Sequence, residues 1–321
     1  GKPPPRTLEL LAVADEESGS AFGSRWLVEH RKDLFRDVSY VLNEGGGVLE
    51  LEGGRSVYNV EIAQKAPLWL RVTAQGPAGH GSAPEPNTAA NVLIRALGRV
   101  AQFHSPIVVL PEVQAMFAAR SAAAADPKRS LYRDLHATLA DPERRAEFLK
   151  DPRDAALVQN TVAITMLSGS PKENVISEHA SAVLDVRLLP GQDATVVTQK
   201  LREVMAEPAL QIETLLSWRG SASPADTPLF GAIQRLAQAR DPGAPVTANM
   251  IGGFTDCNAF RALNLVCYGF FPLHVRMEDV LHVHGTDERV RIDALASAVL
   301  DFSRLITELG PEPRAAAERR K

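Results

Sequence analysis

Three adjacent acidic side chains, Asp15, Glu16 and Glu17, come directly after an apolar run at Thr7–Ala14. Such a run is typical of a strand buried on both faces of a sheet. Neighbouring acids often form a solvated turn, but open α/β sheets bind ligands beyond the carboxyl ends of their strands. Buried adjacent carboxylates repel each other unless a metal ion or a base neutralises them. The pattern therefore predicts a cation beside these acids if they are buried.

Two further motifs offer ligands of related chemistry. Glu44 follows an expected strand at Val38–Leu42 and precedes three glycines, a motif that an ordinary turn explains equally well. His282 and His284 have a spacing that places both rings on one face of an extended segment, where both or only one would bind a metal. Carboxylate and imidazole ligands without thiolate favour Zn²⁺, with Co²⁺ or Mn²⁺ as substitutes. Such a site performs hydrolysis, and a carboxylate that does not bind the metal can act as general base.

A fourth candidate is His80, which lies among small residues in a turn-rich loop at Gly76–Pro86. A solvated loop side chain is the simpler interpretation. The functional interpretation is a donor that stabilises a developing oxyanion.

The elements that must position these residues differ between the ends and the middle of the chain. Strand, helix and strand near residues 7–42 predict an α/β unit with parallel strands, and a helix at Leu229–Ala239 and a strand at Leu265–Phe271 resume it. A last amphipathic helix is expected at Val290–Leu309, with one buried apolar stripe: Ile292, Leu295, Val299, Phe302 and Ile306.

The middle of the chain predicts a small open-faced sandwich inserted into that unit. The expected strands are Leu68–Ala74, Thr161–Leu167, Ala180–Leu189 and Gln211–Leu216. The expected helices are one capped by Asn87 and one at Ala194–Ala206, with short surface helices between Asp-Pro breaks over residues 121–156.

The composition excludes several classes of protein. With 45% hydrophobic and 23% charged residues and a net charge of −4, the chain has no sign of nucleic-acid binding. No apolar run reaches the ~20 residues that a membrane span needs. Its two cysteines, Cys257 and Cys267, are expected to be buried reduced thiols.

The motifs, taken in order, resemble those of the M20 metallopeptidases, which include aminoacylases, glutamate carboxypeptidases and desuccinylases. The matching stretches are ADEESGSAFG, LNEGGG, GPAGHGSAPEPN, NVISEHASAVLDVRLLPG, GGFTDCNAF and VHGTDERV. The resemblance implies a zinc-peptidase-like catalytic domain, a mixed sheet with helices on both faces, and an inserted ferredoxin-like α+β lid and dimerisation domain. The expected division is residues 1–64 and 218–310 for the catalytic domain, 65–217 for the lid domain and 311–321 for a flexible tail.

The resemblance also assigns roles to the acids and histidines. It implies that Glu16 is the general base, and that Glu17, Glu44 and His284 are ligands of a two-zinc site. His80 would be the lid histidine that reaches an active site, often that of the partner subunit. The remaining residues implied at the substrate are Asn174 and Arg187 on the lid and Gly252, Gly253, Thr255 and Asp256 on a catalytic loop.

One part of the family pattern is absent. The family carries a His-x-Asp motif and a metal-bridging Asp before the paired glutamates, and no His-x-Asp occurs in these 321 residues. We therefore expect a preceding segment or another polypeptide to supply those ligands. The predicted function is hydrolysis of an amide or peptide bond next to a free carboxylate, by a homodimer whose substrate is a small peptide or N-acyl amino acid. The alternative is a non-catalytic dimeric module or an inactive fragment.

Overall fold

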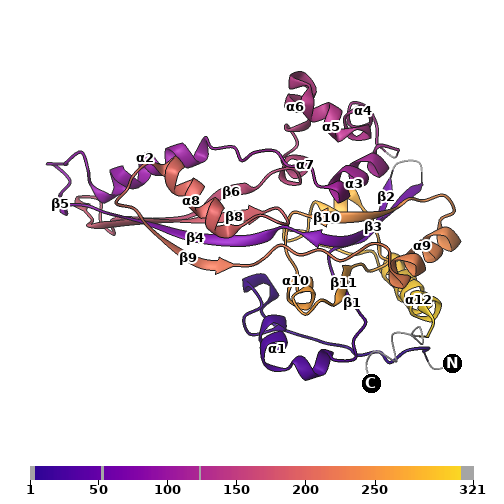
Figure 1. Cartoon of the computed structure of the whole chain (residues 1–321). Coiled ribbons are helices and arrows are strands. Elements are labelled where there is room, and N and C mark those ends of the chain that lie inside the picture. The colour runs from indigo at the N-terminus through magenta and orange to yellow at the C-terminus, as the bar shows by residue number, and fades with distance from the viewer. Residues whose placement is uncertain (1–3, 52–53, 123, 312–321) are drawn as a thin grey trace.

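The computed structural model describes residues 4–51, 54–122 and 124–311. Its two larger sheets follow one another along the length of the molecule (Figure 1), and a third sheet has two short strands. The six-stranded sheet has the order β1-β11-β3-β2-β12, and β10 also pairs with β3. Its strands are β1 (Tyr40–Asn43), β2 (Gly47–Leu51), β3 (Arg55–Gln64), β10 (Val246–Ile251), β11 (Val266–Gly269) and β12 (His274–Arg276). Parallel and antiparallel pairs both occur, so the sheet is mixed.

Helices pack on both sides of the six-stranded sheet (Figure 1). The elements that accompany it, together called the six-stranded unit, are η1 (Glu16–Ser18), α1 (Ser24–His30), η2 (Lys32–Phe35), α9 (Pro228–Arg240), α10 (Cys257–Arg261), α11 (Met277–Val280) and α12 (Ile292–Leu309). The larger core joins the sheet to α9 and to α3 (Pro111–Ser121). A smaller core joins α1, η2 and α10 to β11.

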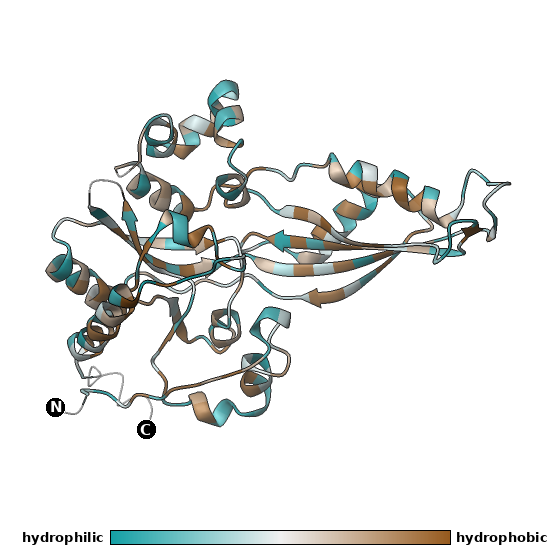
Figure 2. Ribbon diagram, turned by 180° about the vertical axis from the view of Figure 1, so that it is seen from behind, coloured by the Kyte–Doolittle hydropathy of each residue, from teal (hydrophilic) through white to brown (hydrophobic). Residues whose placement is uncertain are grey.

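The four-stranded unit has the order β6-β8-β4-β9, with two helices on one face of its sheet. Its elements are β4 (Ala66–Gln75), α2 (Ala89–Ala101), β6 (Thr161–Ser168), β8 (His179–Leu188), α8 (Ala194–Met205) and β9 (Gln211–Ser217). Hydrophobic and hydrophilic residues alternate along its strands, and the inward set packs against the helices (Figure 2). The four strands and two helices predicted for the middle of the chain are confirmed.

One local prediction in this unit was wrong, and a second, the turn-rich loop at Gly76–Pro86, is confirmed except for two residues. The N-cap of α2 is Thr88, whose hydroxyl accepts from the Asn91 N–H, so Asn87 does not cap the helix. Part of the predicted turn-rich loop forms a strand, β5 (Gly79–His80), which pairs with β7 (Val175–Ile176).

Short helices occupy the segment that the Asp-Pro breaks divide, as predicted. They are α4 (Lys128–Arg133), α5 (Leu135–Ala140), α6 (Pro142–Phe148) and α7 (Pro152–Ala156). The side chains of Asp141 and Asp151 accept from backbone N–H groups at the starts of α6 and α7, where proline is the first helical residue. At Asp126 the carboxylate accepts from the Ser130 N–H in the first turn of α4, at 3.2 Å, and the N-cap residue itself is Pro127.

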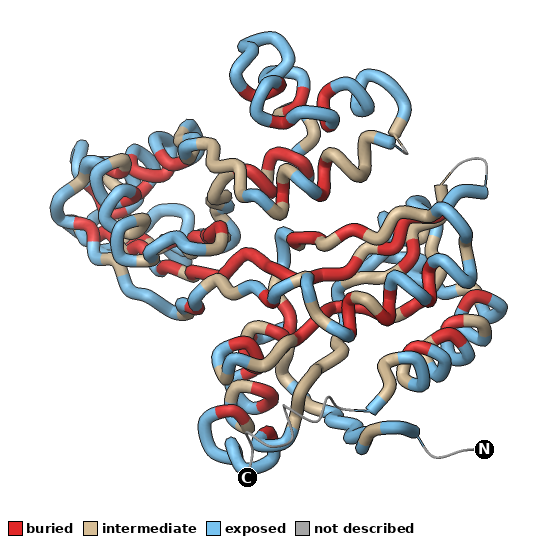
Figure 3. Tube along the Cα trace, turned by 45° about the vertical axis from the view of Figure 1, so that its right-hand side comes forward, coloured by how far each residue is buried: buried red, intermediate tan, exposed pale blue. Residues whose placement is uncertain are grey.

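The expected buried strand at Thr7–Ala14 is not a strand. The segment is extended without a sheet partner and is largely exposed; Leu10 is 97% exposed (Figure 3). Its apolar composition indicated a buried position, but no described element pairs with it.

The face predicted for α12 was also wrong. Ile292 is 86% exposed and Val299 is 58% exposed, whereas Ala294, Ala298 and Leu305 are buried. The helix packs against α9, where small alanines permit close approach and buried Asp301 forms ion pairs with Arg240 and Arg304. The predicted tail, residues 311–321, lies outside the described residues except for Pro311.

The prediction of reduced thiols was wrong as well. Cys257 at the start of α10 and Cys267 in β11 form a buried disulfide across ten positions of sequence. Spacing alone did not reveal the pair, because only the packing of α10 against β11 brings the two residues together. In the described parts of the chain, no helix has the length and apolar character to cross a bilayer.

Candidate active site

Acidic side chains from separate segments gather at one edge of the six-stranded unit. Glu16 and Glu17 lie in η1, Glu44 follows β1, and Asp256 lies at the start of α10. Partial burial, followed by repulsion from Glu44, Glu17 and Asp256, raises the pKa of Glu16 to about 7. The same causes, with Glu17 and Asp256 as the repelling groups, raise the pKa of Glu44. The fold therefore concentrates negative charge where the sequence predicted a cation.

His284 joins this group from a segment near the C-terminus. Its Nε2 atom lies 3.6 Å from Oε1 of Glu17, and its charge opposes the rise in the pKa of Glu44. Its backbone is left-handed, with φ of 61°, and its N–H donates to the Glu288 carboxylate. The ring of His282 contacts the carbonyl of Thr286 instead, so the two histidines do not share a partner.

Asp256 anchors the segment that carries the paired glutamates. Its Oδ1 atom accepts from the hydroxyl of Ser20 at 2.7 Å and from that of Ser24 at 2.5 Å. Asp256 is buried, and these two bonds fix the turn between η1 and α1 against α10. Sequence reasoning named Asp256 but missed both serines, although hydroxyls following an acidic motif were an available signal.

The loop before α10 divides into an open part and a fixed part. Gly252 and Gly253 are exposed, and a side chain at either position would meet no atom within 4 Å. Thr255 is buried, and its N–H and hydroxyl both donate to the side-chain oxygen of Gln64. Beneath the loop, sequence reasoning also missed the buried Glu61–Arg261 pair, whose two hydrogen bonds are 2.9 and 3.0 Å long.

Arg187 of the four-stranded unit reaches toward this loop. Its guanidinium forms two hydrogen bonds with Asp185, at 2.7 and 2.9 Å, and lies 4.9 Å from the ring centre of Phe254. The ring of Phe254 stands edge-on to that of Trp218. The guanidinium of Arg25 lies over the Trp218 ring. These stacked groups connect the two units beside the acids, and Phe254 was not identified from the sequence.

His80 and Asn174 lie together at the far tip of the four-stranded unit, away from the acids of their own chain (Figure 1). The N–H of Gly81 donates to the carbonyl of Asn174, and the ring of His80 contacts the Ser82 hydroxyl at 2.8 Å. Both side chains are exposed. The structure thus brings them to each other and not to Glu16.

The donor chemistry of the acidic group fits zinc only in part. Carboxylate oxygens and an imidazole nitrogen are suitable ligands, and the raised pKa values of Glu16 and Glu44 mark a charge surplus that a cation would relieve. Yet no three His, Cys, Asp or Glu side chains of the described residues are placed to hold one ion. Closing a cage would therefore need further donors or a rearrangement.

Comparison with known proteins supports the resemblance to the M20 family. Residues 62–213 match the peptidase dimerisation domain of the M20 family. The M20 resemblance is confirmed. Human N-fatty-acyl-amino acid synthase/hydrolase PM20D1 is 23% identical over 317 residues, covering 94% of this chain and 61% of that protein. Aminoacylase-1 of Sus scrofa is 23% identical over 319 residues, covering 98% of the chain and 67% of that protein.

Solved structures agree on the fold. The dipeptidase Dug1p of Saccharomyces cerevisiae aligns with a TM-score of 0.64 at 14% identity, covering 94% of this chain and 65% of that one. Human carnosine dipeptidase 1 aligns with a TM-score of 0.62 at 14% identity, covering 92% and 65%. The predicted fold class is confirmed. The chain spans about three-fifths of the length of the PM20D1 proteins that it matches.

Proposed function

We propose that this M20 chain forms the greater part of a metal-dependent hydrolase that cleaves an amide or peptide bond next to a free carboxylate. The observation that carries the proposal is the convergence of Glu16, Glu17, Glu44 and His284 from three distant segments. A chain without such chemistry has no reason to hold mutually repelling acids together, because their repulsion destabilises the fold.

Within this proposal, Glu17, Glu44 and His284 are protein ligands of a two-zinc centre, with Co²⁺ or Mn²⁺ as substitutes. The zinc would supply Lewis acidity at the scissile carbonyl and the attacking water. Glu16 is the residue for proton transfer, because it neighbours the proposed ligand Glu17 and a carboxylate that does not bind the metal can act as general base. It would take the proton from water and return it to the leaving nitrogen.

The substrate carboxylate is assigned to Arg187, whose planar guanidinium suits a carboxylate. Asp185 accepts from Nε and Nη2 of that guanidinium and so orients it, while the N–H groups of Nη1 are left for a substrate carboxylate. Gly252 and Gly253 leave open space nearby in which the substrate backbone can approach. Small peptides and N-acyl amino acids are the substrate classes we propose, in keeping with the names of the relatives.

Dimerisation through the four-stranded unit is also proposed. The matched domain is a dimerisation domain, and exposed apolar side chains lie on α2 (Ile94) and on the edge strand β6 (Met166 and Leu167). An edge strand with free backbone groups can pair with a copy of itself. A dimer would give His80 and Asn174, at the tip of one unit, a route to the acids of the partner subunit.

The second candidate is a non-catalytic dimeric module. Two observations favour it: the described residues hold no three-ligand group, and Arg187 is already engaged by Asp185. The two candidate functions differ in one measurable respect: the hydrolase requires that the zinc-loaded protein turn over substrate, whereas the non-catalytic module does not.

The test is a comparison of residues 1–321 with the product of any longer reading frame that extends upstream of Gly1. Each is loaded with zinc, analysed for bound metal and assayed on dipeptides and N-acyl amino acids. The short chain is expected to bind zinc weakly and to be inactive, because a catalytic zinc needs three protein ligands. The longer protein is expected to bind two ions and to lose activity when the substrate carboxylate is amidated. Full zinc binding without turnover on any of these substrates would favour the non-catalytic module.

A further inference from the structure

A cavity of about 460 Å³ lies beside the candidate active site and includes none of the residues assigned to it. Its walls come from α1, the start of η2, the segment 217–221 that returns from the four-stranded unit, and α10. The apolar part of the wall consists of Val28, Ala259, Ala262 and Leu263, and the indole of Trp218 completes it.

Three cations line this cavity: Arg25, Lys32 and Arg219. Among the described residues, none of the three forms an ion pair within 4 Å, although ion pairs are frequent elsewhere on the chain. Glu29 is the only acid in the lining, so the lining carries a formal surplus of two positive charges. Three cations in one lining raise the local concentration of anions, although Arg219 also interacts electrostatically with Asp193 outside the lining.

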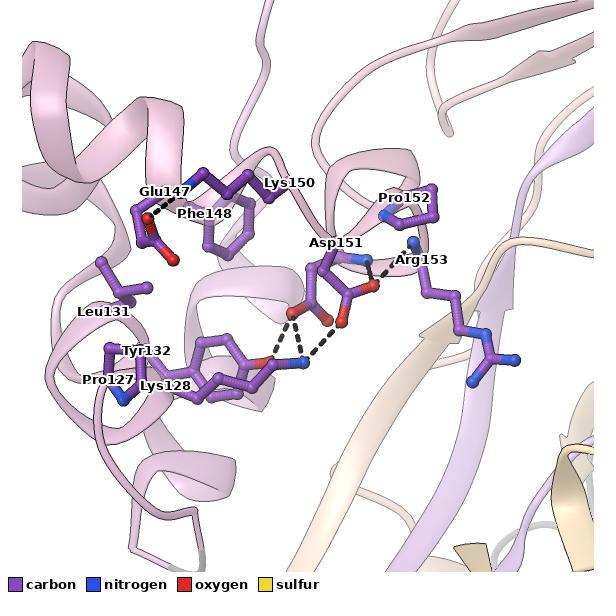
Figure 4. A pocket seen from close by; sticks show the side chains of 11 residues that line it. Pro127, Lys128, Leu131, Tyr132, Glu147, Phe148, Lys150, Asp151, Pro152 and Arg153 are labelled. Carbon is purple, nitrogen blue, oxygen red and sulfur yellow. Dashed lines mark hydrogen bonds and ion pairs between the residues drawn. The ribbon is translucent and has the colours of Figure 1, made fainter. Parts of the chain in front are cut away.

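A second cavity, of about 530 Å³, provides a contrast within the same chain. It lies among the short helices, and its charged side chains face one another except for Arg153, whose guanidinium points away (Figure 4). Lys128 contacts Asp151 and Asp154, and Lys150 contacts Glu147. The charges of that cavity neutralise each other, which leaves little for a ligand to gain. The cavity beside α10 lacks such internal pairs.

The cavity beside α10 also has neutral polar residues in its lining. Ser217 and Ser221 belong to its lining. The Asn258 side chain donates to the Arg219 carbonyl at 2.7 Å and to the Ser221 hydroxyl at 3.4 Å. Arg25 lies 5.2 Å from the Trp218 ring centre, so its guanidinium is placed by stacking and keeps its N–H donors. The site therefore combines charged donors with an apolar wall.

We propose that this cavity binds a small organic anion, whose carboxylate or phosphate lies between Arg25, Lys32 and Arg219 and whose short apolar part contacts Val28 and Leu263. The occupant would sit between α1 and α10, the two helices that the Ser24–Asp256 hydrogen bond joins. It would also lie against Trp218, which contacts Phe254 in the loop before α10. Binding there would thus reach the segments that carry Glu16, Glu17 and Asp256. The proposal does not depend on the hydrolase activity.

The test measures binding of hexanoate, phenyl phosphate and the uncharged hexanamide at constant ionic strength by calorimetry. The full chain is first treated with a chelator and dialysed, so that anion binding to a metal cannot contribute. Saturable binding of at least one anion, without binding of hexanamide, is expected. Which anion binds more tightly distinguishes a carboxylate ligand from a phosphate ligand.

Two variants decide where the anion binds. In Lys32→Gln/Arg219→Gln the dissociation constant is expected to rise by about tenfold or more, because charge-assisted hydrogen bonds are lost. The matched control, Arg133→Gln/Lys172→Gln, removes the same charge from exposed positions outside the cavity and is expected to bind as the parent does. Ala262→Phe keeps every charge but fills the cavity, and should also weaken binding.

Three results would overturn the proposal. The first is the absence of saturable binding of either anion at millimolar concentration. The second is equal weakening in the cavity variant and in the control, which would indicate a general effect of charge. The third is undiminished binding in Ala262→Phe. Circular dichroism melting of each variant establishes that it is folded before its binding is measured.

Discussion

The two units of this protein differ in how completely they bury their own apolar residues. In the four-stranded unit, α2 and α8 cover the inward residues of β4 and β8, and the alternation along β8 is regular. In the six-stranded unit, Leu10, Ile292 and Val299 face solvent although their pattern indicated burial. The apolar pattern therefore matches burial along β4 and β8 of the four-stranded unit, although Ile94 on α2 and Met166 and Leu167 on β6 stay exposed. In the six-stranded unit, by contrast, part of an apolar face is covered by no described residue.

The largest expected effect concerns catalysis and separates the two units by function. In the zinc-loaded protein with its complete metal centre, Glu16→Gln should lower turnover by about 10²-fold or more while zinc content stays unchanged, because a base is lost without a ligand. The matched variant Glu178→Gln, in the loop before β8, should be as active as the parent. Equal activity of all three proteins would show that Glu16 is only a partly buried acid.

The different burial of apolar residues in the two units predicts that equivalent substitutions will have different effects on the free energy of unfolding. Leu184→Ala in β8 should lower the free energy of unfolding by about 2–5 kcal/mol, because the side chain is fully buried. Val299→Ala on α12 should change it by about 0.5 kcal/mol or less, because that side chain is 58% exposed. Urea denaturation measures both. A large loss from Val299→Ala would mean that α12 is covered in the folded protein in solution.

The disulfide contributes to the six-stranded unit alone. Replacing both Cys257 and Cys267 by serine should lower the free energy of unfolding by about 2–3 kcal/mol, since a cross-link across ten positions restricts the unfolded chain. The four-stranded unit carries no disulfide among its described residues. Mass spectrometry of the alkylated protein, with and without reduction, establishes whether the bond is present. A denaturation midpoint that reduction leaves unchanged would contradict this prediction.

A further prediction concerns the joint between the units, where stability should depend on pH. Lys65 is buried between β3 and β4, and its ammonium donates to the carbonyls of Ala156 and Gln159 and to the Thr161 hydroxyl. Burial, followed by repulsion from Arg187, lowers the pKa of Lys65 from 10.5 to about 7. Between these two values the unfolded chain binds more protons than the folded one, so stability should rise as pH increases from about 7 to about 10.5.

Lys65→Met should abolish that rise, because it removes the titrating group but keeps much of the buried volume. Thermal melting across this pH range measures the effect, and Lys172→Met is the control at an exposed position. A parent protein whose stability falls over the same range, with the variant following it, would show that Lys65 stays protonated in the folded state.

Local sequence patterns were enough to predict most of the four-stranded unit, and the motifs supplied the list of candidate site residues. Alternation in Ala180–Leu189 and the apolar stripe of α2 are local patterns, and local patterns fix which face of a strand or helix is buried when a complete core is present. The Asp-Pro helix starts at Asp141 and Asp151 were readable for the same reason, because cap and first turn are neighbours in sequence. Glu16, Glu44 and His284 were found through the M20 resemblance and their positions beside predicted elements; their roles stay predictions.

Only the tertiary structure decided what depends on contacts between distant segments. Three sets of contacts are of this kind, because no sequence pattern indicates that their residues meet. They are the Cys257–Cys267 disulfide, the hydrogen bonds from Ser20 and Ser24 to Asp256, and the contacts of Arg187 with Asp185 and Phe254. The same holds for α12, where contact with α9 and the burial of Asp301 overrode a clear amphipathic stripe. Periodicity predicts which residues can be buried together. Which of them are buried depends on the neighbours that the rest of the fold provides.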